Sequence, residues 1–388
     1  MQILKNALLI FFVNMAFLSC SGKKSEISEK EPADSVNTTT FKNPLPIAFG
    51  DPYVLYASDG KYYMYGTGGG AKDGFAAYSS HDLVDWSPEG QVYYGNTDDS
   101  WGIGAFWAPE VYQVNGKYYM FYSAQWRYNP TNELENFLIG VAVADSPTGP
   151  FKDLTNKPLF DPGYPIIDAN VFFDDDGKVY LYYSRACYKH PVESEIADLA
   201  RQKGWFEEIE ESWIYGVEIN PDFSGTVGEP VLILRPPVKL DDEQAEWESR
   251  SVTSQEVNRR WTEGSYTFKK NETYYMMYSA NHFAGENYAV GYATAKKPLG
   301  PYKKAATNPI LQKNTGEGGE VTGTGHNSIV YSPDGTEMFC VYHGRTTATG
   351  DERVVFIDRM EILDDGTLVV YGPNTEPQPA PSGQAVNH

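Results

Sequence analysis

Apolar and polar positions alternate along the chain in five short stretches that resemble one another. Each stretch starts at a turn and continues into a β-rich strand, and another short strand comes directly before each turn. This pattern predicts five β-hairpins. The repeated stretches are GKYYMYGT from Gly60, GKYYMFYS from Gly116, GKVYLYYS from Gly177, NETYYMMYS from Asn271 and GTEMFCVYH from Gly335.

A second phrase follows most of the hairpins, as in AAYSSHDLVDW and VGYATAKKPLGPY, and predicts a third strand, a turn and the start of a fourth. The hairpin turns lie 56, 61, 94 and 64 residues apart, wider than the roughly 40 to 50 residues of common propeller repeats. We therefore predict an all-β, five-bladed β-propeller whose innermost strands line a central channel. A β-sandwich or a β-helix also uses many short strands, but neither predicts similar hairpins at five wide intervals.

The long interval between the third and fourth hairpins contains two segments that we interpret as insertions on one rim. Residues 190–212 are acidic with some helical character, and residues 239–261 read KLDDEQAEWESRSVTSQEVNRRW. The propeller is expected to occupy residues 43–378, which leaves no room for a second domain. The last residues, 379–388, are expected to be a disordered tail.

The first 20 residues have the features of a secretory signal. Lys5 precedes a mostly apolar run from Ala7 to Leu18, which ends at Ser19-Cys20. A cysteine at this place is typical of a bacterial lipoprotein; an ordinary signal peptide with an incidental cysteine is the alternative. Residues 21–42 predict a flexible tether. We expect an exported protein, periplasmic or anchored to the outer membrane, that contacts the membrane only through its lipid.

The charge and cysteine content narrow the possible partners. A net charge of -21 argues against nucleic acid or an anionic membrane surface, and favours a neutral glycan. The other two cysteines, Cys187 and Cys340, lack metal-type spacing and are interpreted as buried structural thiols. No cofactor is expected to be needed for the chemistry, and a monomer is expected.

Three acids and one histidine precede the predicted inner strands at matching positions. Counting back nine residues from the turn glycine gives Asp51, Asp168 and His326, and counting back eight from Asn271 gives Glu263. Equivalent positions of a propeller lie near one another around the axis, so we expect these side chains to converge. Crowded carboxylates raise one another's pKa, a cost that is tolerable mainly where the perturbation is used.

Residues 174–176 form a triple aspartate before a glycine and have a simpler interpretation. They lie at a predicted hairpin tip, where aspartate is a common and hydrated turn residue.

Paired carboxylates with a third nearby suit the hydrolysis of a glycosidic bond, in which one acid protonates the departing oxygen and one base activates water. The acid must stay protonated near neutral pH, and neighbouring negative charge promotes this. We assign Asp51 as the general base and Glu263 as the general acid. Asp168 is assigned to keep Glu263 protonated and correctly oriented.

Several motifs in this order resemble glycoside hydrolase family 43 over about residues 43–378. They are GDPYVLYASDGKYYMYGT, FWAPEVYQVNGKYYMFYS, IIDANVFFDDDGKVYLYYS, TEGSYTFKKNETYYMMYS, and GTGHNSIVYSPDG followed by YHGR. The resemblance implies a five-bladed propeller and an inverting enzyme that acts on arabinose- and xylose-containing glycans. It also implies the same roles for Asp51, Asp168 and Glu263. Two departures, Ser265 after EG and Ala169 after Asp168, stand where the family often has proline.

The resemblance suggests roles for three further residues, each with an alternative. His326 is expected near a calcium or other ion on the axis that is held largely through water, or it is a satisfied channel histidine. Trp107 either stacks on a sugar ring or packs between blades. Arg345 either binds substrate or forms a surface salt bridge.

The substrate prediction is an α-L-arabinofuranosyl unit of a plant-type polysaccharide or oligosaccharide. β-D-xylosidase activity, or another activity of family 43, is the alternative. A different class, a sugar-binding propeller without catalysis, would repeat the same binding residues in every blade. The matching positions here hold different residues, as an asymmetric active site requires.

Overall fold

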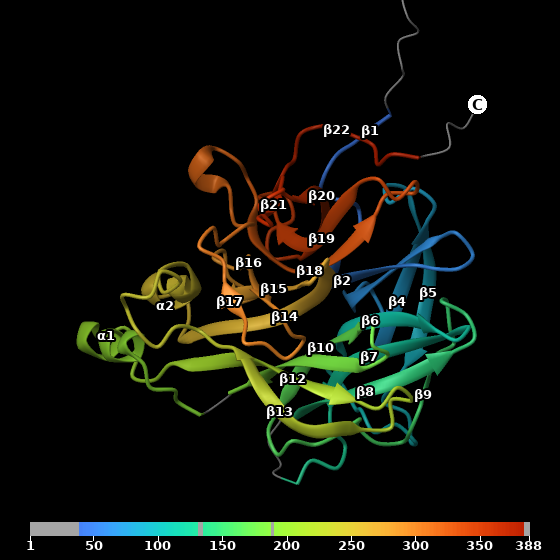
Figure 1. Cartoon of the computed structure of the whole chain (residues 1–388), viewed down its shortest axis with the longest axis horizontal. Helices are drawn as coiled ribbons and strands as arrows, with labels where there is room; N and C mark the ends of the chain where they lie inside the picture. The colour runs from blue at the N-terminus through green and yellow to red at the C-terminus, as the bar shows by residue number, and fades with distance from the viewer. Residues whose placement is uncertain (1–38, 131–134, 188–189, 384–388) are drawn as a thin grey trace, which may run out of the picture. The chain divides into compact units, whose positions relative to one another are not determined.

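The computed structural model describes residues 39–130, 135–187 and 190–383, and almost all of its regular structure is β (Figure 1). The predicted signal segment, with Cys20, and the tether up to residue 38 lie outside the described residues. Helices within the described ranges are α1 (Glu195–Lys203), α2 (Arg250–Thr253) and the 3₁₀ turns η1 (Trp247–Ser249) and η2 (Thr315–Glu317). None of the helices in these ranges has the length and hydropathy needed to cross a membrane.

Three of the sheets each contain four strands that follow one another in the sequence and pair antiparallel. The first consists of β2 (Phe49–Tyr56), β3 (Tyr62–Gly68), β4 (Gly74–Ser80) and β5 (Trp86–Tyr94). The second consists of β6 (Trp107–Val114), β7 (Lys117–Gln125), β8 (Phe137–Ala144) and β9 (Lys152–Asp153). The third consists of β18 (Thr322–Tyr331), β19 (Met338–Arg345), β20 (Val354–Ile362) and β21 (Leu368–Val370).

The remaining long sheet contains eight strands in two groups of four. The first group is β10 (Ile166–Phe173), β11 (Val179–Ala186), β12 (Glu210–Ile219) and β13 (Thr226–Leu234). The second group is β14 (Arg259–Lys270), β15 (Thr273–Asn281), β16 (Ala289–Ala295) and β17 (Lys303–Lys304). Strands β12 and β14 join the groups through a short parallel ladder, from Glu210↔Arg259 to Ser212↔Trp261. All five predicted hairpins are therefore present, as the pairs β2–β3, β6–β7, β10–β11, β14–β15 and β18–β19.

The two ends of the described chain meet in a small sheet of their own. Strand β1 (Thr40–Phe41) pairs antiparallel with β22 (Gln378–Pro379). The alanine after β22, Ala380, donates its backbone N–H to the carbonyl of Thr39 at 2.8 Å. This differs from the expectation of a disordered tail from residue 379, because these last residues are fixed by backbone hydrogen bonds. Residues 384–388 lie outside the described part of the chain.

The first strand of every hairpin contains a β-bulge at the same place. The ladder shifts register there in all five pairs, and one residue at or beside the shift adopts a left-handed backbone. A non-glycine residue in this conformation is strained, so its repetition indicates a constraint shared by all five units. The residues are Asp51 (φ 53°), Ala108 (φ 45°), Asp168 (φ 59°), Gly264 (φ 56°) and His326 (φ 49°).

The backbone N–H groups of these bulge residues link each hairpin to the one before it. Four of them donate to a side chain on the second strand of the preceding hairpin. The bonds are Ala108 to Thr67 Oγ1 (2.9 Å), Asp168 to Ser123 Oγ (3.0 Å), His326 to Ser279 Oγ (2.7 Å) and Asp51 to His343 Nδ1 (3.1 Å). We call this set of contacts the bulge ring.

The fourth hairpin varies this arrangement, and the last bond closes the ring. Gly264 donates its N–H to Asp168 Oδ2 at 3.3 Å, and Ser184 Oγ donates to the same oxygen at 3.1 Å. The bond from Asp51 to His343 joins residues 292 positions apart in the sequence. Because Nδ1 of His343 accepts this hydrogen bond, this nitrogen of the imidazole must carry no proton. Burial and the charge of Arg353 hold the pKa of His343 well below its usual value, which keeps it neutral.

Apolar residues of the second strands fill the space between the sheets. Met64, Met120, Leu181, Met276 and Cys340 occupy matching places in β3, β7, β11, β15 and β19, and all five are fully buried. Cys187 is also buried, and both cysteines are free thiols. The interpretation of these two cysteines as buried structural thiols is therefore confirmed.

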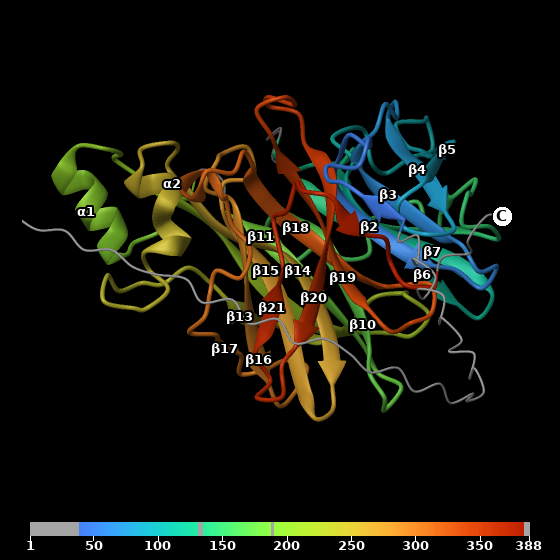
Figure 2. The same cartoon turned by 90° about the horizontal axis from the view of Figure 1, so that it is seen from above.

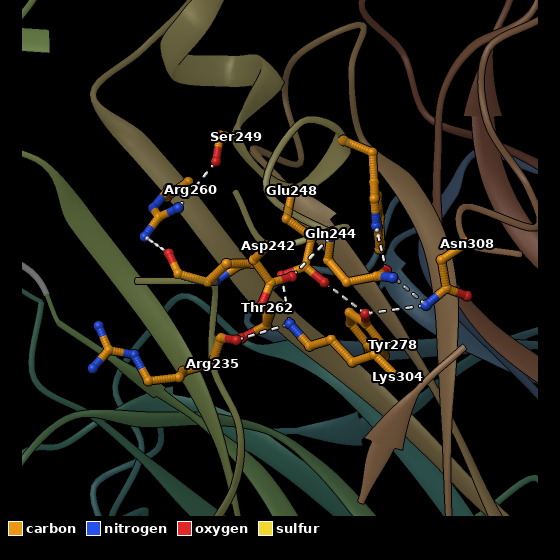
Figure 3. Close-up of polar contacts among 12 residues, drawn as sticks. Arg235, Asp242, Gln244, Glu248, Ser249, Arg260, Thr262, Tyr278, Lys304 and Asn308 are labelled. Atoms are coloured by element: carbon orange, nitrogen blue, oxygen red, sulfur yellow. Dashed lines mark hydrogen bonds and ion pairs between the residues drawn. The ribbon is translucent and has the colours of Figure 1, made fainter. Parts of the chain in front are cut away.

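The predicted rim insertions form α1 and the η1–α2 segment, which lie together at one side of the molecule in both views (Figures 1 and 2). A buried polar network fastens the second insertion to the sheet (Figure 3). Glu248 accepts hydrogen bonds from Tyr278 Oη and Lys304 Nζ, both at 2.6 Å. Nearby, the fully buried Arg260 and Glu211 form an ion pair at 2.8 Å.

This network also supports the segment that follows β15. Ser251 of α2 donates its N–H to Asn281 Oδ1 at 3.0 Å, and its Oγ accepts the N–H of His282 at 2.9 Å. The next residues of that segment include Phe283 and Tyr288, which line the cavity described below. The insertion is therefore a structural support for one wall of that cavity.

The charge of Glu248 can be removed without changing its shape. We expect Glu248→Gln to lower the free energy of unfolding by about 3 kcal/mol or more, because Lys304 then keeps a partly buried charge without its partner. The matched control Glu246→Gln breaks an exposed ion pair with Arg250 and should cost less than about 1 kcal/mol. Urea unfolding of the three proteins measures both values. Equal stability of Glu248→Gln and the wild type would contradict this role.

Candidate active site

The predicted acids converge on one cavity at the end of the structure where the first strands of the hairpins begin. The cavity has a volume of about 160 Å³. Asp51, Asp168 and Glu263 are 9%, 7% and 4% exposed, so all three carboxyl groups are largely removed from water. The lining residues are Asp51, Trp107, Ile167, Asp168, Trp261, Glu263, Phe283, Tyr288, His326 and Arg353.

Asp51 is surrounded by groups that favour its ionised form. Oδ1 lies 2.8 Å from Arg353 Nη1 and 3.2 Å from His326 Nδ1, and Oδ2 accepts a hydrogen bond from Thr67 Oγ1 at 2.5 Å. Burial alone raises the pKa of Asp51, but the charges of Arg353 and His326 outweigh it and hold the pKa well below its ordinary value. Asp51 is therefore an anion across the usual pH range.

Asp168 and Glu263 form a pair that cannot both ionise easily. Burial raises the pKa of each, and for Glu263 the second cause is the negative charge of Asp168. Asp168 is the better stabilised anion, because its Oδ2 accepts hydrogen bonds from Ser184 and from the N–H of Gly264. The pair therefore holds one proton, and that proton resides on Glu263, whose pKa is raised well above its ordinary value.

His326 lies between the carboxylates and is positively charged. Burial lowers its pKa, but the charge of Asp51 and the hydrogen bond with it outweigh burial and raise the pKa to about 9. The imidazole packs against Gly264, where an added Cβ would come within 2.9 Å of Nδ1. A larger residue at position 264 would therefore displace His326.

The residues of the cavity offer few ligands for the expected ion on the axis. Calcium prefers oxygen ligands, and a lone histidine is a weak ligand for it. Within residues 39–130, 135–187 and 190–383, no group of three or more His, Cys, Asp or Glu side chains could hold a metal ion directly. Direct ligation by His326 therefore does not fit these residues. An ion held through water stays a prediction, and no step proposed below uses it.

Aromatic side chains form the walls of the cavity. Trp107 lines it and also packs on Phe137, with ring centroids 4.3 Å apart. Both alternatives given for Trp107 are thus compatible with its position. Trp261, Phe283 and Tyr288 complete the walls, and Phe283 is 38% exposed at the rim. These three residues carry no repeated sequence signal that could have identified them.

Arg353, rather than Arg345, is the arginine of the cavity. Arg345 is buried behind the wall, and its Nε donates to the carbonyl of Asp351 at 3.0 Å. Arg353 lies directly before β20 and reaches Asp51 across Gly50, where a Cβ would come within 2.0 Å of the guanidinium. Arg345 is not among the lining residues of the cavity and is too buried for a surface salt bridge, and its expected role in binding substrate stays a prediction. Gly50, the glycine of the GDP motif, is the sequence signal that could have indicated a side chain packed at this position.

An anionic carboxylate and a protonated carboxyl group that share one small cavity match the base and the acid of a class of enzyme, the glycoside hydrolases. Comparison with known proteins agrees. Residues 41–368 match glycosyl hydrolases family 43, and the chain belongs to this family. Members of the family are β-propellers and invert the anomeric configuration, so this protein is an inverting glycoside hydrolase.

The chain is similar in sequence to relatives that are named for different activities. The β-D-galactofuranosidase of Aspergillus niger is 28% identical over 87% of this chain and 86% of its own length. The xylosidase/arabinosidase of Bacteroides ovatus is 28% identical over 67% of this chain and 78% of its own length. A crystal structure of a thermostable family-43 glycoside hydrolase superimposes with a TM-score of 0.75 and 38% identity, over 89% of this chain and all of that one.

The contact between Arg353 and Asp51 gives a titration test. Arg353→Gln should raise the pKa of the Asp51 carboxyl group, because it removes the largest stabiliser of the anion. NMR titration of proteins labelled at the aspartate carboxyl carbons measures this pKa. Arg359→Gln, which removes an ion pair with Glu337 instead, serves as the matched control. An unchanged Asp51 pKa in Arg353→Gln would contradict the assigned electrostatics.

Proposed function

We propose that the protein removes α-L-arabinofuranosyl units from a plant-type polysaccharide or oligosaccharide by single displacement. The observation that carries the hydrolytic part of this proposal is that Asp51 and Glu263 line one cavity, where their surroundings hold the pKa of Asp51 low and raise that of Glu263. A base must be ionised and an acid must be protonated before the reaction starts. The small volume of the cavity favours one sugar ring at the cleaved position.

In the proposed reaction, Asp51 accepts a proton from the water that attacks the anomeric carbon. Glu263 donates its proton to the departing glycosidic oxygen, and the bond between that oxygen and the anomeric carbon breaks. Asp168 acts through Glu263, because its negative charge raises the pKa of the acid. Water attacks from the face opposite to the departing oxygen, which inverts the configuration.

The names of the relatives support a furanoside as the first candidate substrate and a xyloside as the second. The Aspergillus niger relative is named for a furanoside. A Bacillus subtilis relative, 26% identical over 77% of this chain and 57% of its own length, is named an arabinoxylan arabinofuranohydrolase. The Bacteroides ovatus relative is named for both xylosidase and arabinosidase activity. β-D-Xylosidase activity is therefore the second candidate.

We also propose that the propeller has five blades. In this view the eight-stranded sheet consists of two blades, β10–β13 and β14–β17, which a three-residue parallel ladder connects at one end. The fivefold repetition of the bulge supports this count, as do the four bulge N–H groups that donate to a hydroxyl or imidazole group of the preceding hairpin. The blades would then extend over residues 43–378.

The cellular setting follows from the sequence expectations. We propose an exported lipoprotein that is lipidated at Cys20 and tethered through residues 21–42, acting as a monomer on a neutral glycan in the periplasm or at the outer membrane. The acidic net charge of -21 supports a glycan rather than a polyanion.

Wild-type protein should hydrolyse 4-nitrophenyl α-L-arabinofuranoside faster than the β-D-xyloside. Asp51→Asn and Glu263→Gln should each reduce kcat on the arabinofuranoside by at least about a thousandfold, because general acid or base catalysis and positioning are lost together. Far-UV circular dichroism and the thermal unfolding midpoint check that both variants fold. Wild-type rates in either folded variant would contradict the assignment.

Asp168→Asn tests the assisting role through the pH profile. Removing the negative charge lowers the pKa of Glu263, so Glu263 loses its proton at lower pH. The basic limb of kcat/KM should therefore move to lower pH. Asp174→Asn, at the tip of the β10–β11 hairpin, is the matched control and should leave the limb in place. A basic limb that stays in place or moves upward in Asp168→Asn would contradict the role.

A further inference from the structure

A second cavity of about 440 Å³ lies beside the proposed active site. Its lining includes Trp126, Asn136, Tyr164, Arg185 and Ala186. One apolar cluster separates the two cavities, and it contains Trp107, Ile167 and Trp261 of the first cavity together with Ala186 of the second. The two cavities therefore lie on opposite sides of one buried cluster, next to each other in the fold.

Arg185 is the distinctive residue of this second cavity. The nearby arginines each pair with a carboxylate: Arg235 with Glu211 at 3.0 Å, Arg259 with Glu210 at 2.8 Å, and Arg260 with Glu211 at 2.8 Å. Arg185 forms no ion pair within the described part of the chain, and its buried Nε has no hydrogen-bond partner there. Arg345 also forms no ion pair among the described residues, but its Nε donates to the carbonyl of Asp351, whereas Nε of Arg185 has no partner there.

Aromatic rings hold the guanidinium of Arg185 in place. Its Cζ lies 4.1 Å from the centroid of the Tyr164 ring and 5.6 Å from that of Trp213. Tyr164 is itself fixed, because its hydroxyl lies 3.0 Å from that of Tyr183. The cation is thus positioned in advance, and its free N–H groups suit a planar acceptor with two oxygens.

The planar acceptor that matches a guanidinium is a carboxylate. In a glycan, carboxylates belong to uronic acid units. One acidic residue, Asp161, also lines the cavity, and its Oδ1 accepts the N–H of Gly163 at 2.8 Å. Its charge, together with the acidic net charge of the protein, opposes a chain with many carboxylates but permits a single one.

We propose that this second cavity binds the carboxylate of a single uronic acid unit carried by the otherwise neutral glycan. Arg185 forms the charged contact, and the unit lies on the far side of the apolar cluster from the cleaved sugar. The proposal rests on the proposed function only for the identity of that glycan.

The test measures binding without catalysis, because every protein in it carries Glu263→Gln, so that β-D-xylosidase activity cannot consume the ligand; wild type here means Arg185 unchanged in this background. Isothermal titration calorimetry compares a xylo-oligosaccharide that carries one glucuronic acid branch with the same oligosaccharide without it; neither contains arabinose. Wild-type protein should bind the acidic oligosaccharide at least about tenfold more tightly, as expected for hydrogen bonds to a charged group. The difference should fall as salt concentration rises.

Variants connect this preference to Arg185. Arg185→Gln should abolish the preference, and Arg185→Lys should keep part of it, since the charge remains but the two-pronged geometry is lost. Arg201→Gln, which removes an exposed cation of α1, should retain the full preference. Equal affinity for the two oligosaccharides in the wild type, or an undiminished preference in Arg185→Gln, would overturn the proposal. The aryl arabinofuranoside contains no uronic acid. Its rate of hydrolysis therefore tests the proposed function independently of Arg185.

Discussion

The structure depends on the bulge ring, in which the N–H of a left-handed residue in one hairpin is bonded to a side chain of the hairpin before it. A left-handed backbone at a non-glycine residue is strained, and hydrogen bonds compensate for this strain where the surrounding structure enforces it. The ring repeats five times and closes between Asp51 and His343. It therefore joins the first hairpin to the last and fixes the side chains of the bulges around one cavity.

This arrangement brings three carboxyl groups close together. Different neighbouring groups determine whether each of them is ionised. Asp51 receives two cations and a hydroxyl donor, so it remains an anion. Asp168 receives a hydroxyl and a backbone N–H. At Glu263, burial and the negative charge of Asp168 outweigh the charge of His326 and the hydroxyl of Tyr288, so the pKa is raised well above its ordinary value. Side chains at or beside equivalent bulges thus provide a base and an acid in one cavity, because their neighbours differ.

The sequence predicted the features that repeat. The hairpins follow from periodicity, and the matching offsets of Asp51, Asp168 and His326 correspond to equivalent bulges. Glu263 falls one residue early because Gly264 occupies its bulge, where the packed His326 leaves no room for a Cβ.

Features without a repeat could not be predicted in this way. Arg353 lies directly before a third strand and reaches the cavity only through the space left by Gly50. The polar network around Glu248 and the pairing of β1 with β22 connect segments far apart in the sequence, and no local pattern indicates them. Arg345, which belongs to the YHGR motif, is buried and absent from the lining of the cavity, so its role in binding substrate stays a prediction.

The central claim is that Glu263 carries the single proton of the buried pair while Asp168 and Asp51 are ionised. Carbon-detected NMR of protein labelled at the glutamate and aspartate carboxyl carbons, titrated with and without Glu263→Gln, observes this proton directly. The predicted result is a Glu263 signal that remains protonated well above the ordinary glutamate pKa, while the Asp51 signal stays ionised into the acid range. A Glu263 carboxyl group that ionises at its ordinary pKa would contradict the account.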